Sequence, residues 1–527
     1  MDIDVEEKRR NVIPRWRDFK TTLALGELES VGKQITTVPP KEEGHIDDQI
    51  EDWRRNQSLA FATDLVGAAF VLGITDDIEE AAQFIISAES QSNDLQKRIA
   101  RQAIDKDFCR RLLTLDDVHL NSREIIEQSK ENVRRRRAQL QQSLRDPIKL
   151  VELSREYATL GSLDKAVRTM EIAVALAPAN RFVLRSAARL FVHANLIEKA
   201  HYILRRAPSL RFDPWLLSAE IAVSSMRNLT SANVSRGIAW ANNSDFHAFD
   251  LSELSSAVAT VEMNHGSVKN ARKLFRKALK MPTDNSIAQV EWASRRSVEF
   301  DLDLGQFDIA RNFEAPAWKF FSGGNMEDAL KLGKSWILDQ PFAVSPVNFV
   351  GMVAGLTEEF DLANEIYSFG LRANPENATL RNNLAFTLAS SDRPIEAQKE
   401  LDRIDRMSPD LTIQQKIVII ATEGLIKFRM GFAAEGRSLY TKAMEFAKEN
   451  NEPGYALRAM LYLAKEEINT ETSDALTALE KVENEAKKYN PSQEMTIMLH
   501  RLKSYIENHP EKFEWLRLKD KHATQPR

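Results

Sequence analysis

The sequence predicts an all-α protein, an α-solenoid in which antiparallel helix pairs are stacked one after another. The main observation is a step of 34 residues between small residues and between prolines. The residues that keep this step are Ala166 and Ala200, then Ala329, Ala363 and Ala397, and also Pro341, Pro375 and Pro409. A fixed step of this length is typical of repeated helix–turn–helix units. A second observation is that 527 residues contain 18 prolines and 19 glycines, few enough for long helices to persist.

The composition indicates a cytoplasmic chain and excludes several classes. A net charge of −5 shows no overall basic character, so a nucleic-acid role would need a local patch. The single cysteine, Cys109, excludes an intrachain disulfide and suits a reducing compartment. No apolar run approaches about 18 residues, and the start MDIDVEEKRR has no apolar core behind it. We therefore predict neither a membrane span nor a secretory signal.

The chain divides into six predicted segments. Residues 1–50 are an extended, poorly periodic lead-in that docks on the body through Ile13, Trp16, Phe19, Leu23 and Leu25. The remaining segments are a helical N-terminal region with a degenerate repeat and basic helices (51–145), a first repeat array (146–283), an irregular helical break (284–312), a second repeat array (313–490), and a capping helix with a charged tail (491–527).

The first clear repeat unit occupies residues 146–178. It is marked by Leu150, Leu153, Ser154, Tyr157, Gly161, Ala166, Met170, Ala173 and Pro178. Small residues at these positions let two helices approach closely, larger ones fill the gaps between units, and the proline ends the second helix. This pattern resembles the tetratricopeptide repeat family, in a bacterial-type form with degenerate repeats. The resemblance implies a superhelix whose concave groove is lined by the first helix of each unit.

Signatures of catalysis are not found in the sequence. Phosphate-binding loops, G-x-G-x-x-G, H-E-x-x-H, C-x-x-C and G-x-S-x-G motifs are all missing. An acidic cluster could gather round a hard cation if its backbone were extended, but a solvated loop with helix-capping aspartates is the favoured interpretation. Its members are Glu299, Asp301, Asp303 and Asp308. We therefore predict no enzyme, no catalytic residue, no metal site and no cofactor.

Transferring the groove positions of the tetratricopeptide family to the N-terminal array identifies a basic groove. Its residues are Arg155, Phe182, Arg185 and Arg189. Arg185 and Arg189 are four residues apart and share a helix face, which suggests a surface for an acidic peptide or a nucleic-acid backbone. The alternative is that these arginines pair with nearby Glu152, Glu156 and Glu171 on solvated faces.

The same transfer in the C-terminal array identifies a groove of apolar and amide side chains. Its residues are Trp318, Phe321, Asn348, Met352, Asn382 and Phe386. Asparagines suit the backbone of an extended peptide, and aromatic and sulfur side chains suit its pockets. Some family members clamp a C-terminal carboxylate with a lysine and an asparagine, but Asn382 and Phe386 occupy those positions here, so that clamp is not reproduced.

Two functions are the leading candidates at this stage, and a third alternative, a cryptic enzyme in residues 1–145, has no residues that support a specific reaction. The first is a non-catalytic scaffold or adaptor that binds a protein partner in its groove, as part of a multiprotein complex. The second is a nucleic-acid-binding or nuclease-associated subunit of a bacterial system, such as one for anti-phage defence. It rests on the segment NVIPRWRDF, which is similar to segments of bacterial repeat proteins that accompany nucleases, and on a possible polyanion patch at Arg134, Arg135, Arg136 and Arg137. Four consecutive helical residues point in every direction, so a solvated face also explains that run.

Overall fold

The structure is a computed structural model of the whole chain. It describes residues 10–17, 19, 45–72, 78–88, 92, 96–97, 99–101, 120–143, 145–242, 246–296, 302, 307, 309–407, 411–488, 491 and 493–513. Every regular element in these ranges is a helix, which confirms the predicted all-α class. Within the same ranges, no helix is both long and apolar enough to cross a lipid bilayer.

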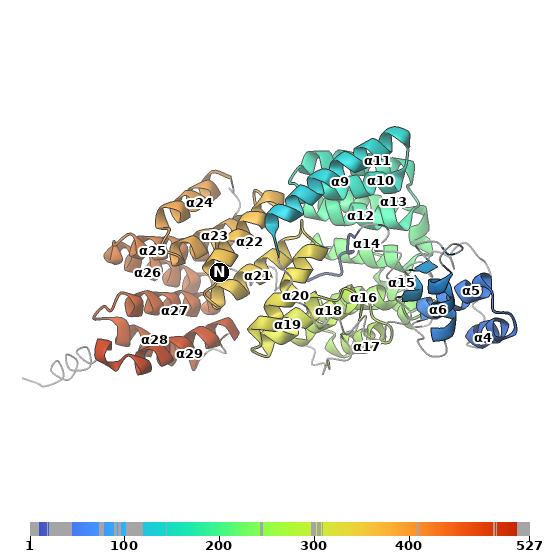
Figure 1. Cartoon of the computed structure of the whole chain (residues 1–527). Helices are drawn as coiled ribbons and strands as arrows, with labels where there is room; N and C mark the ends of the chain where they lie inside the picture. The colour runs from blue at the N-terminus through green and yellow to red at the C-terminus, as the bar shows by residue number, and fades with distance from the viewer. Residues whose placement is uncertain are drawn as a thin grey trace, which may run out of the picture.

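The described helices follow one another along the chain in the order shown in Figure 1. They are α4 (His45–Arg55), α5 (Leu59–Leu72), α6 (Glu79–Ser87), α9 (Ser122–Gln142), α10 (Pro147–Thr159), α11 (Leu163–Leu176), α12 (Arg181–His193), α13 (Ile197–Arg206), η2 (Pro208–Arg211), α14 (Pro214–Met226), α15 (Val234–Asn242), α16 (Ser252–Asn264), α17 (Val268–Ala278), α18 (Asp284–Ser294), α19 (Glu314–Ser322), α20 (Met326–Asp339), α21 (Val344–Leu356), α22 (Phe360–Ala373), α23 (Ala378–Ser390), α24 (Pro394–Met407), α25 (Ile413–Arg429), α26 (Ala433–Glu449), α27 (Pro453–Asn469), α28 (Ala475–Ala486) and α29 (Gln493–Asn508).

Consecutive helices pack as pairs, and the pairs stack. The pairs include α10–α11, α12–α13, α16–α17, α21–α22, α23–α24 and α25–α26. The first helices of successive pairs also contact one another, in the rows α10–α12–α14–α16–α18 and α21–α23–α25–α27–α29. This second set of contacts places the first helices on the inner side of the curve, so the array is an α-solenoid of the tetratricopeptide-repeat type.

The 34-residue step has the predicted physical cause. Its five alanines lie on the second helices of their pairs and are fully buried: Ala166, Ala200, Ala329, Ala363 and Ala397. The first helices provide matching space at Gly351, where an added Cβ would lie 2.3 Å from Cζ of Tyr367 on the next helix. Of the three prolines in the step, Pro341 and Pro375 follow the ends of α20 and α22, and Pro409 lies outside the described residues.

Helix starts are set by capping residues. Asp146 and Asp213 accept hydrogen bonds from the first backbone amides of α10 and α14, and each is followed by a proline at the first helical position. Thr283 and Ser286 form a reciprocal capping box at the start of α18. The first part of segment 284–312, for which the sequence predicts an irregular helical break, thus forms the regular helix α18, which extends the inner row of helices.

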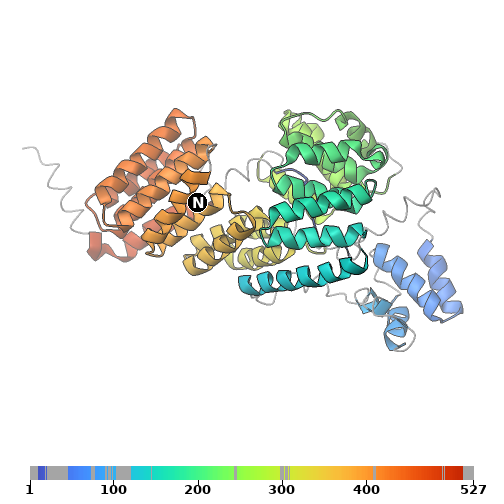
Figure 2. The same cartoon turned by 90° about the horizontal axis from the view of Figure 1, so that it is seen from above.

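The apolar interior falls into three clusters. One is formed mainly by α9–α18 and also includes Val12 and Trp16 near the N-terminus. A second is formed mainly by α19–α29, and a small third one mainly by α4–α6. Figure 2 shows α4–α6 set apart from the stacked helices. Helix α4 starts at His45, so the helical N-terminal region begins a few residues before the predicted boundary at residue 50.

Candidate functional site

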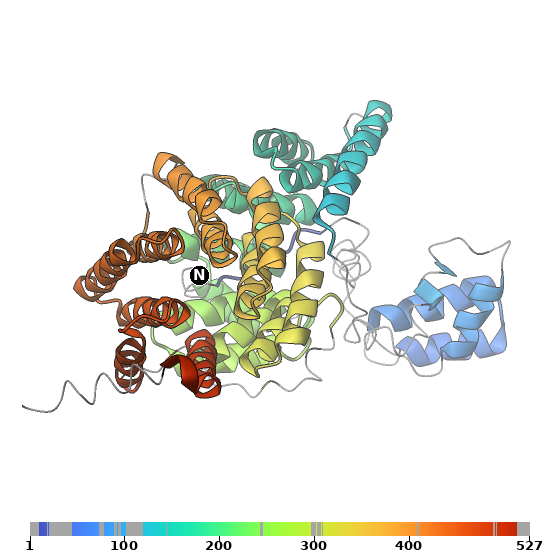
Figure 3. The same cartoon turned by 60° about the vertical axis from the view of Figure 1, so that its left-hand side comes forward.

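The concave side of the solenoid holds a stretch of the chain's own N-terminus. Residues 10–17, called the N-terminal arm from here on, run extended along the inside of the curve (the short dark-blue trace in Figures 1 and 3). Trp16 is fully buried and Arg17 is 5% exposed. The side chains that hold the arm form a site that we call the arm channel. They are Arg155 of α10, Asp284, Asn285 and Gln289 of α18, Glu314 of α19, and Asp339 of α20.

Arg17 forms the central ion pairs of the arm channel. Its Nε lies 3.0 Å from each carboxylate oxygen of Asp339, and its Nη2 donates to Oδ2 of Asp284 at 2.8 Å. One guanidinium thereby bridges the end of α20 and the start of α18. Guanidinium suits this position because its planar fork of donors can engage two carboxylates at once.

Arg10 and Arg15 share a second carboxylate, that of Glu314. Arg10 binds it through two parallel bonds, Nε to Oε1 at 2.7 Å and Nη2 to Oε2 at 3.1 Å. Arg15 donates to the same Oε2 and, through Nε, to Asp284 Oδ2 at 3.1 Å. Arg10 also reaches Gln289 Oε1 at 2.6 Å. Three arginines of the arm are thus matched to three buried carboxylates of the channel.

The channel also binds the main chain of the arm. Asn285 Nδ2 donates to the carbonyl of Ile13 at 3.0 Å, and Gln289 Nε2 donates to the carbonyl of Arg10 at 3.0 Å. Arg155 Nε donates to the carbonyl of Trp16 at 3.2 Å. Side-chain donors aimed at backbone carbonyls are a common way to hold an extended peptide, because every residue of the peptide presents the same acceptor.

Apolar contacts fix the register of the arm. The ring of Trp16 lies 5.2 Å from that of Phe342, which follows α20, and Val12 is buried as well. Phe19, two residues past the arm, meets Phe182 of α12 edge to face at 5.1 Å. Aromatic pairs at these distances add to the stabilisation that comes from burial alone.

The electrostatic state of the channel follows from its ion pairs. Burial alone would raise the pKa of Glu314, but Arg10 and Arg15 outweigh it and hold that pKa far below its usual range. Burial likewise opposes ionisation of Asp339, yet Arg17 and Arg311 lower its pKa to about 2. The pKa of Asp284 is lowered against burial by Arg17 and Arg15. All three carboxylates are therefore charged at neutral pH while the arm is in place.

The four residues of the predicted basic groove have different contacts in the structure. Arg155 and Phe182 contact the arm region, as described above. Arg185 is instead a buried ion-pair partner of Glu253 at 2.8 Å, with its guanidinium 4.7 Å from the centre of the Trp215 ring. The guanidinium carbon of Arg189 lies 5.4 Å from the centre of the Phe342 ring. Of the alternative pairings with Glu152, Glu156 and Glu171, the one with Glu152 is formed by Arg136, whereas Arg185 pairs with Glu253. Binding of a partner by the four groove residues stays a prediction.

The predicted C-terminal groove residues lie mostly in the interior. Phe321, Asn348, Met352, Asn382 and Phe386 are all buried. Trp318 is half-buried, 4.7 Å from the ring of Phe349 and 4.3 Å from the guanidinium carbon of Arg295. Asn348 accepts a hydrogen bond from Asn383 at 3.2 Å, whereas both amide atoms of buried Asn382 lack a partner within the described residues. Partner binding here also stays a prediction.

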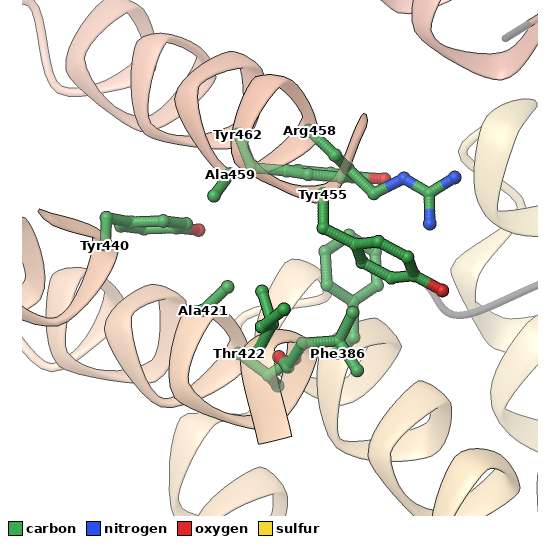
Figure 4. A pocket seen from close by; sticks show the side chains of 10 residues that line it. Phe386, Ala421, Thr422, Tyr440, Tyr455, Arg458, Ala459 and Tyr462 are labelled. Atoms are coloured by element: carbon green, nitrogen blue, oxygen red, sulfur yellow. The ribbon is translucent and has the colours of Figure 1, made fainter. Parts of the chain in front are cut away.

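The C-terminal superhelix, which comprises helices α19–α29, closes on itself through polar contacts and has a small cleft nearby. Arg501 of α29 donates to the carbonyl of Leu356 on α21, and Lys465 of α27 lies 3.6 Å from Glu358. The cleft, about 350 Å³ including open solvent, is lined by Phe386, Tyr440, Tyr455, Arg458, Tyr462 and neighbouring apolar side chains (Figure 4). Its walls come from α23, α25, α26 and α27 of the same superhelix.

The remaining sequence candidates are placed as follows. On α9, Arg134, Arg135 and Arg137 are exposed, whereas Arg136 faces Glu152 of the neighbouring α10. Arg134 pairs with Glu131 on its own helix at 3.2 Å. The four members of the acidic cluster and Cys109 lie outside the described residues. In the part of the chain that the structure describes, no group of three His, Cys, Asp or Glu residues could hold a metal ion.

Sequence reasoning missed the acidic half of the site. It expected the lead-in to dock and named Ile13, Trp16 and Phe19 as anchors, but it did not identify Asp284, Glu314 and Asp339. A signal was present, since an arm with Arg15 and Arg17 on either side of a tryptophan requires carboxylates wherever it is buried. The segment 284–312 was interpreted as a break in the repeats, so its first helix was not considered as a groove wall.

The fold and the channel together define a tetratricopeptide-type α-solenoid that encloses an extended segment. Solved structures similar to this chain include the crystal structure of yeast Tom70 (15% identity, 76% of this chain and 99% of that chain covered, TM-score 0.32). Another is the crystal structure of the APC/C hetero-tetramer Cut9-Hcn1 (10% identity, 91% of this chain and 99% of that chain covered, TM-score 0.36). A third is the crystal structure of a tetratricopeptide repeat protein from Parabacteroides merdae (10% identity, 60% of this chain and 98% of that chain covered, TM-score 0.25). At these scores, the assignment of the fold rests on the helix packing itself.

No protein-family model matches the chain. No curated protein matches it either.

Proposed function

We propose that the chain is a non-catalytic scaffold or adaptor that holds a protein partner on the concave side of its solenoid, within a multiprotein complex of the cytoplasm. The observation that carries this proposal is the arm channel. A surface that binds eight extended residues through both their side chains and their carbonyls has the geometry needed to bind a partner's segment.

The chemistry of the channel supports binding rather than reaction. Its carboxylates are held charged by direct contact with guanidinium groups, and its amide side chains donate to backbone carbonyls. A general acid or base at neutral pH needs a pKa near 7, whereas the pKa values of these three carboxylates are displaced away from it.

The nucleic-acid alternative has weaker support in the structure. The exposed arginines of α9 share their helix with Glu127 and Glu131, which pair with Lys130 and Arg134. A mixed surface of this kind attracts phosphate less strongly than an unbroken basic face. Polyanion binding by α9 therefore stays a prediction, with its own test in the Discussion.

Site-specific photo-crosslinking in the native host tests the scaffold proposal. A photoreactive phenylalanine analogue would replace Phe182, which lies beside the arm, and in a control Tyr202, an exposed residue of α13. We expect a crosslinked partner protein from position 182 that is missing from position 202. Crosslinks from position 182 to the chain's own N-terminus alone would contradict the proposal, as would equal crosslinking from both positions.

A further inference from the structure

The arm is bound in the way that a separate peptide would be bound. Among the described residues, no backbone-to-backbone hydrogen bond joins the arm to the solenoid, and its single internal one runs from Ile13 to Asn11 at 2.8 Å. Within the described ranges of the chain, each hydrogen bond between the arm and the solenoid has a side chain as at least one partner. An example is the bond from Nη2 of Arg17 to the carbonyl oxygen of Arg311 at 3.3 Å. The solenoid's own hydrogen-bonded framework of helices therefore does not include the arm.

The walls of the channel nevertheless need a cationic occupant. Asp284 and Glu314 form their ion pairs with Arg10, Arg15 and Arg17 of the arm. Of the three carboxylates, Asp339 also pairs with a residue of the solenoid, Arg311 at 2.7 Å. Without an occupant, neighbouring buried carboxylates would face one another, and this repulsion already acts between Asp284 and Asp339. An apolar or acidic segment would leave this repulsion in place.

The spacing of the contacts defines the occupant more closely. Arg15 and Arg17 both reach Asp284, while the tryptophan between them enters the apolar site beside Phe342. Carbonyls at positions 10, 13 and 16 meet fixed donors. The channel therefore recognises an extended segment with two arginines that flank one large apolar or aromatic residue.

We propose that the arm is a built-in competitor: it occupies the binding site for an extended Arg–aromatic–Arg segment of a partner protein, and that segment displaces it. This inference rests on the proposed scaffold function and adds the partner's chemistry and its regulation. The arm keeps the buried carboxylates neutralised until the partner arrives.

The arm is covalently linked to the solenoid by the intervening chain, which we call the tether. This link determines which other segment can displace the arm from the channel. A segment linked to its own site competes at an effective concentration on the order of millimolar. An identical arm from a second copy gains nothing over the resident one, so it does not displace it at ordinary concentrations. A partner that also contacts the solenoid outside the channel gains the additional affinity that displacement requires. The partner is therefore a different protein with a second point of contact.

Cutting the tether after folding tests this inference on the full chain. A specific protease site would replace residues 30–36, which lie between the arm and α4 in the sequence. A fluorescent peptide that copies residues 8–20 would then be added to cut and uncut protein, and its anisotropy measured. We expect the cut protein to bind at least 10-fold more tightly. Changing both Arg15 and Arg17 of the peptide to Ala should weaken binding at least about 100-fold, and changing both to Lys should weaken it less.

Each of the other outcomes would contradict a specific part of this proposal. Equal binding to cut and uncut protein removes the self-competition and leaves the channel as a peptide site, so the scaffold function would survive. Equal binding of the arginine-free peptide removes the predicted chemistry of the partner. A cut protein that neither releases its arm nor binds the peptide after incubation in 0.5 M salt shows that the arm is a permanent part of the fold. Dimers of uncut protein with exchanged arms would make a second copy the occupant.

Discussion

The arm channel and the C-terminal superhelix are built from the same helix pairs but are filled in opposite ways. The arm channel is filled by residues from the other end of the sequence, through buried ion pairs such as Arg17 with Asp339. The C-terminal superhelix is filled by its own walls, through contacts such as Phe386 with Tyr462 at 5.1 Å. The comparison shows that the repeats supply a curved surface, while the side chains at its inner positions decide whether that surface holds a segment or closes.

The two regions should also differ in how protons affect them. In the arm channel, folding lowers carboxylate pKa values, because arginine charges outweigh burial. In the C-terminal superhelix, burial first and a nearby carboxylate second raise the pKa of Tyr440 and Tyr462 well above the usual value. The three carboxylates of the channel are therefore bound in their charged form, whereas the two tyrosines of the C-terminal superhelix are buried in their neutral form, next to ion pairs such as Arg458 with Glu494.

Removing the central guanidinium should produce the largest effect. Arg17→Ala leaves Asp284 with one fewer cation and removes the arm's link to Asp339, and breaking a buried ion pair costs about 3–5 kcal/mol. Native-state hydrogen exchange should show faster opening of α18 and α20, with α25–α29 unchanged. Arg393→Ala, which breaks an exposed pair with Glu396, is the matched control. A loss no greater than that of the control would mean that the arm contributes little to the channel.

Acid should loosen the channel before the C-terminal superhelix. Because folding lowers the pKa of Asp339 from 3.8 to about 2, its contribution is present above about pH 4 and is lost as the pH falls toward 2. Asp339 alone accounts for about 2 kcal/mol, and Asp284 and Glu314 act in the same direction. Pepsin, which is active at low pH, should cut the arm before it cuts α25–α29. Simultaneous cleavage would contradict the difference.

Alkali should have the opposite effect. The raised pKa values of Tyr440 and Tyr462 mean that their contribution is present below about pH 10 and is lost as the pH rises further. Tyrosinate absorbance should therefore rise in two phases, exposed tyrosines first and these two together with the loss of helical circular dichroism. Tyr440→Phe should remove part of the second phase. A single phase at the usual pKa would show that water reaches these rings.

Closing the space between paired helices should destabilise the C-terminal array moderately. In Gly351→Ala the new Cβ would lie 2.3 Å from the Tyr367 ring, and overpacking of this kind costs about 1–3 kcal/mol. Gly454→Ala in α27 is the control, because nothing lies within 4 Å of the added atom. Urea denaturation compares the two variants. Equal midpoints would show that the helices of this pair separate easily.

Changing the exposed arginines of α9 should have the smallest effect on stability. We expect the triple variant Arg134→Glu, Arg135→Glu and Arg137→Glu to keep the wild-type melting temperature, because exposed substitutions rarely alter stability. If α9 binds duplex DNA, its affinity should fall, and the log–log slope of affinity against salt should become shallower by about one unit for each phosphate that α9 no longer neutralises. An unchanged slope would exclude this face as a nucleic-acid site.

The helix pairs could be predicted from the sequence because their cause is local. A small residue is required wherever two neighbouring helices touch, so Ala329, Ala363 and Ala397 record the repeat directly, and all three are buried as expected. Arg155 and Phe182 could be placed in the groove by the same phase, because position within a repeat determines which way a side chain points.

The arm channel required the tertiary structure. Arg17 and Asp339 are 322 residues apart, and no periodicity links an arginine in an aperiodic segment to a carboxylate at the end of a distant helix. The same limit explains why Arg185 was expected to be available for a partner, although it is neutralised by Glu253, 68 residues away. A repeat pattern specifies neighbours along the array. Which charges meet across its concave side depends on how far the superhelix curves, and that is the sum of many small packing angles.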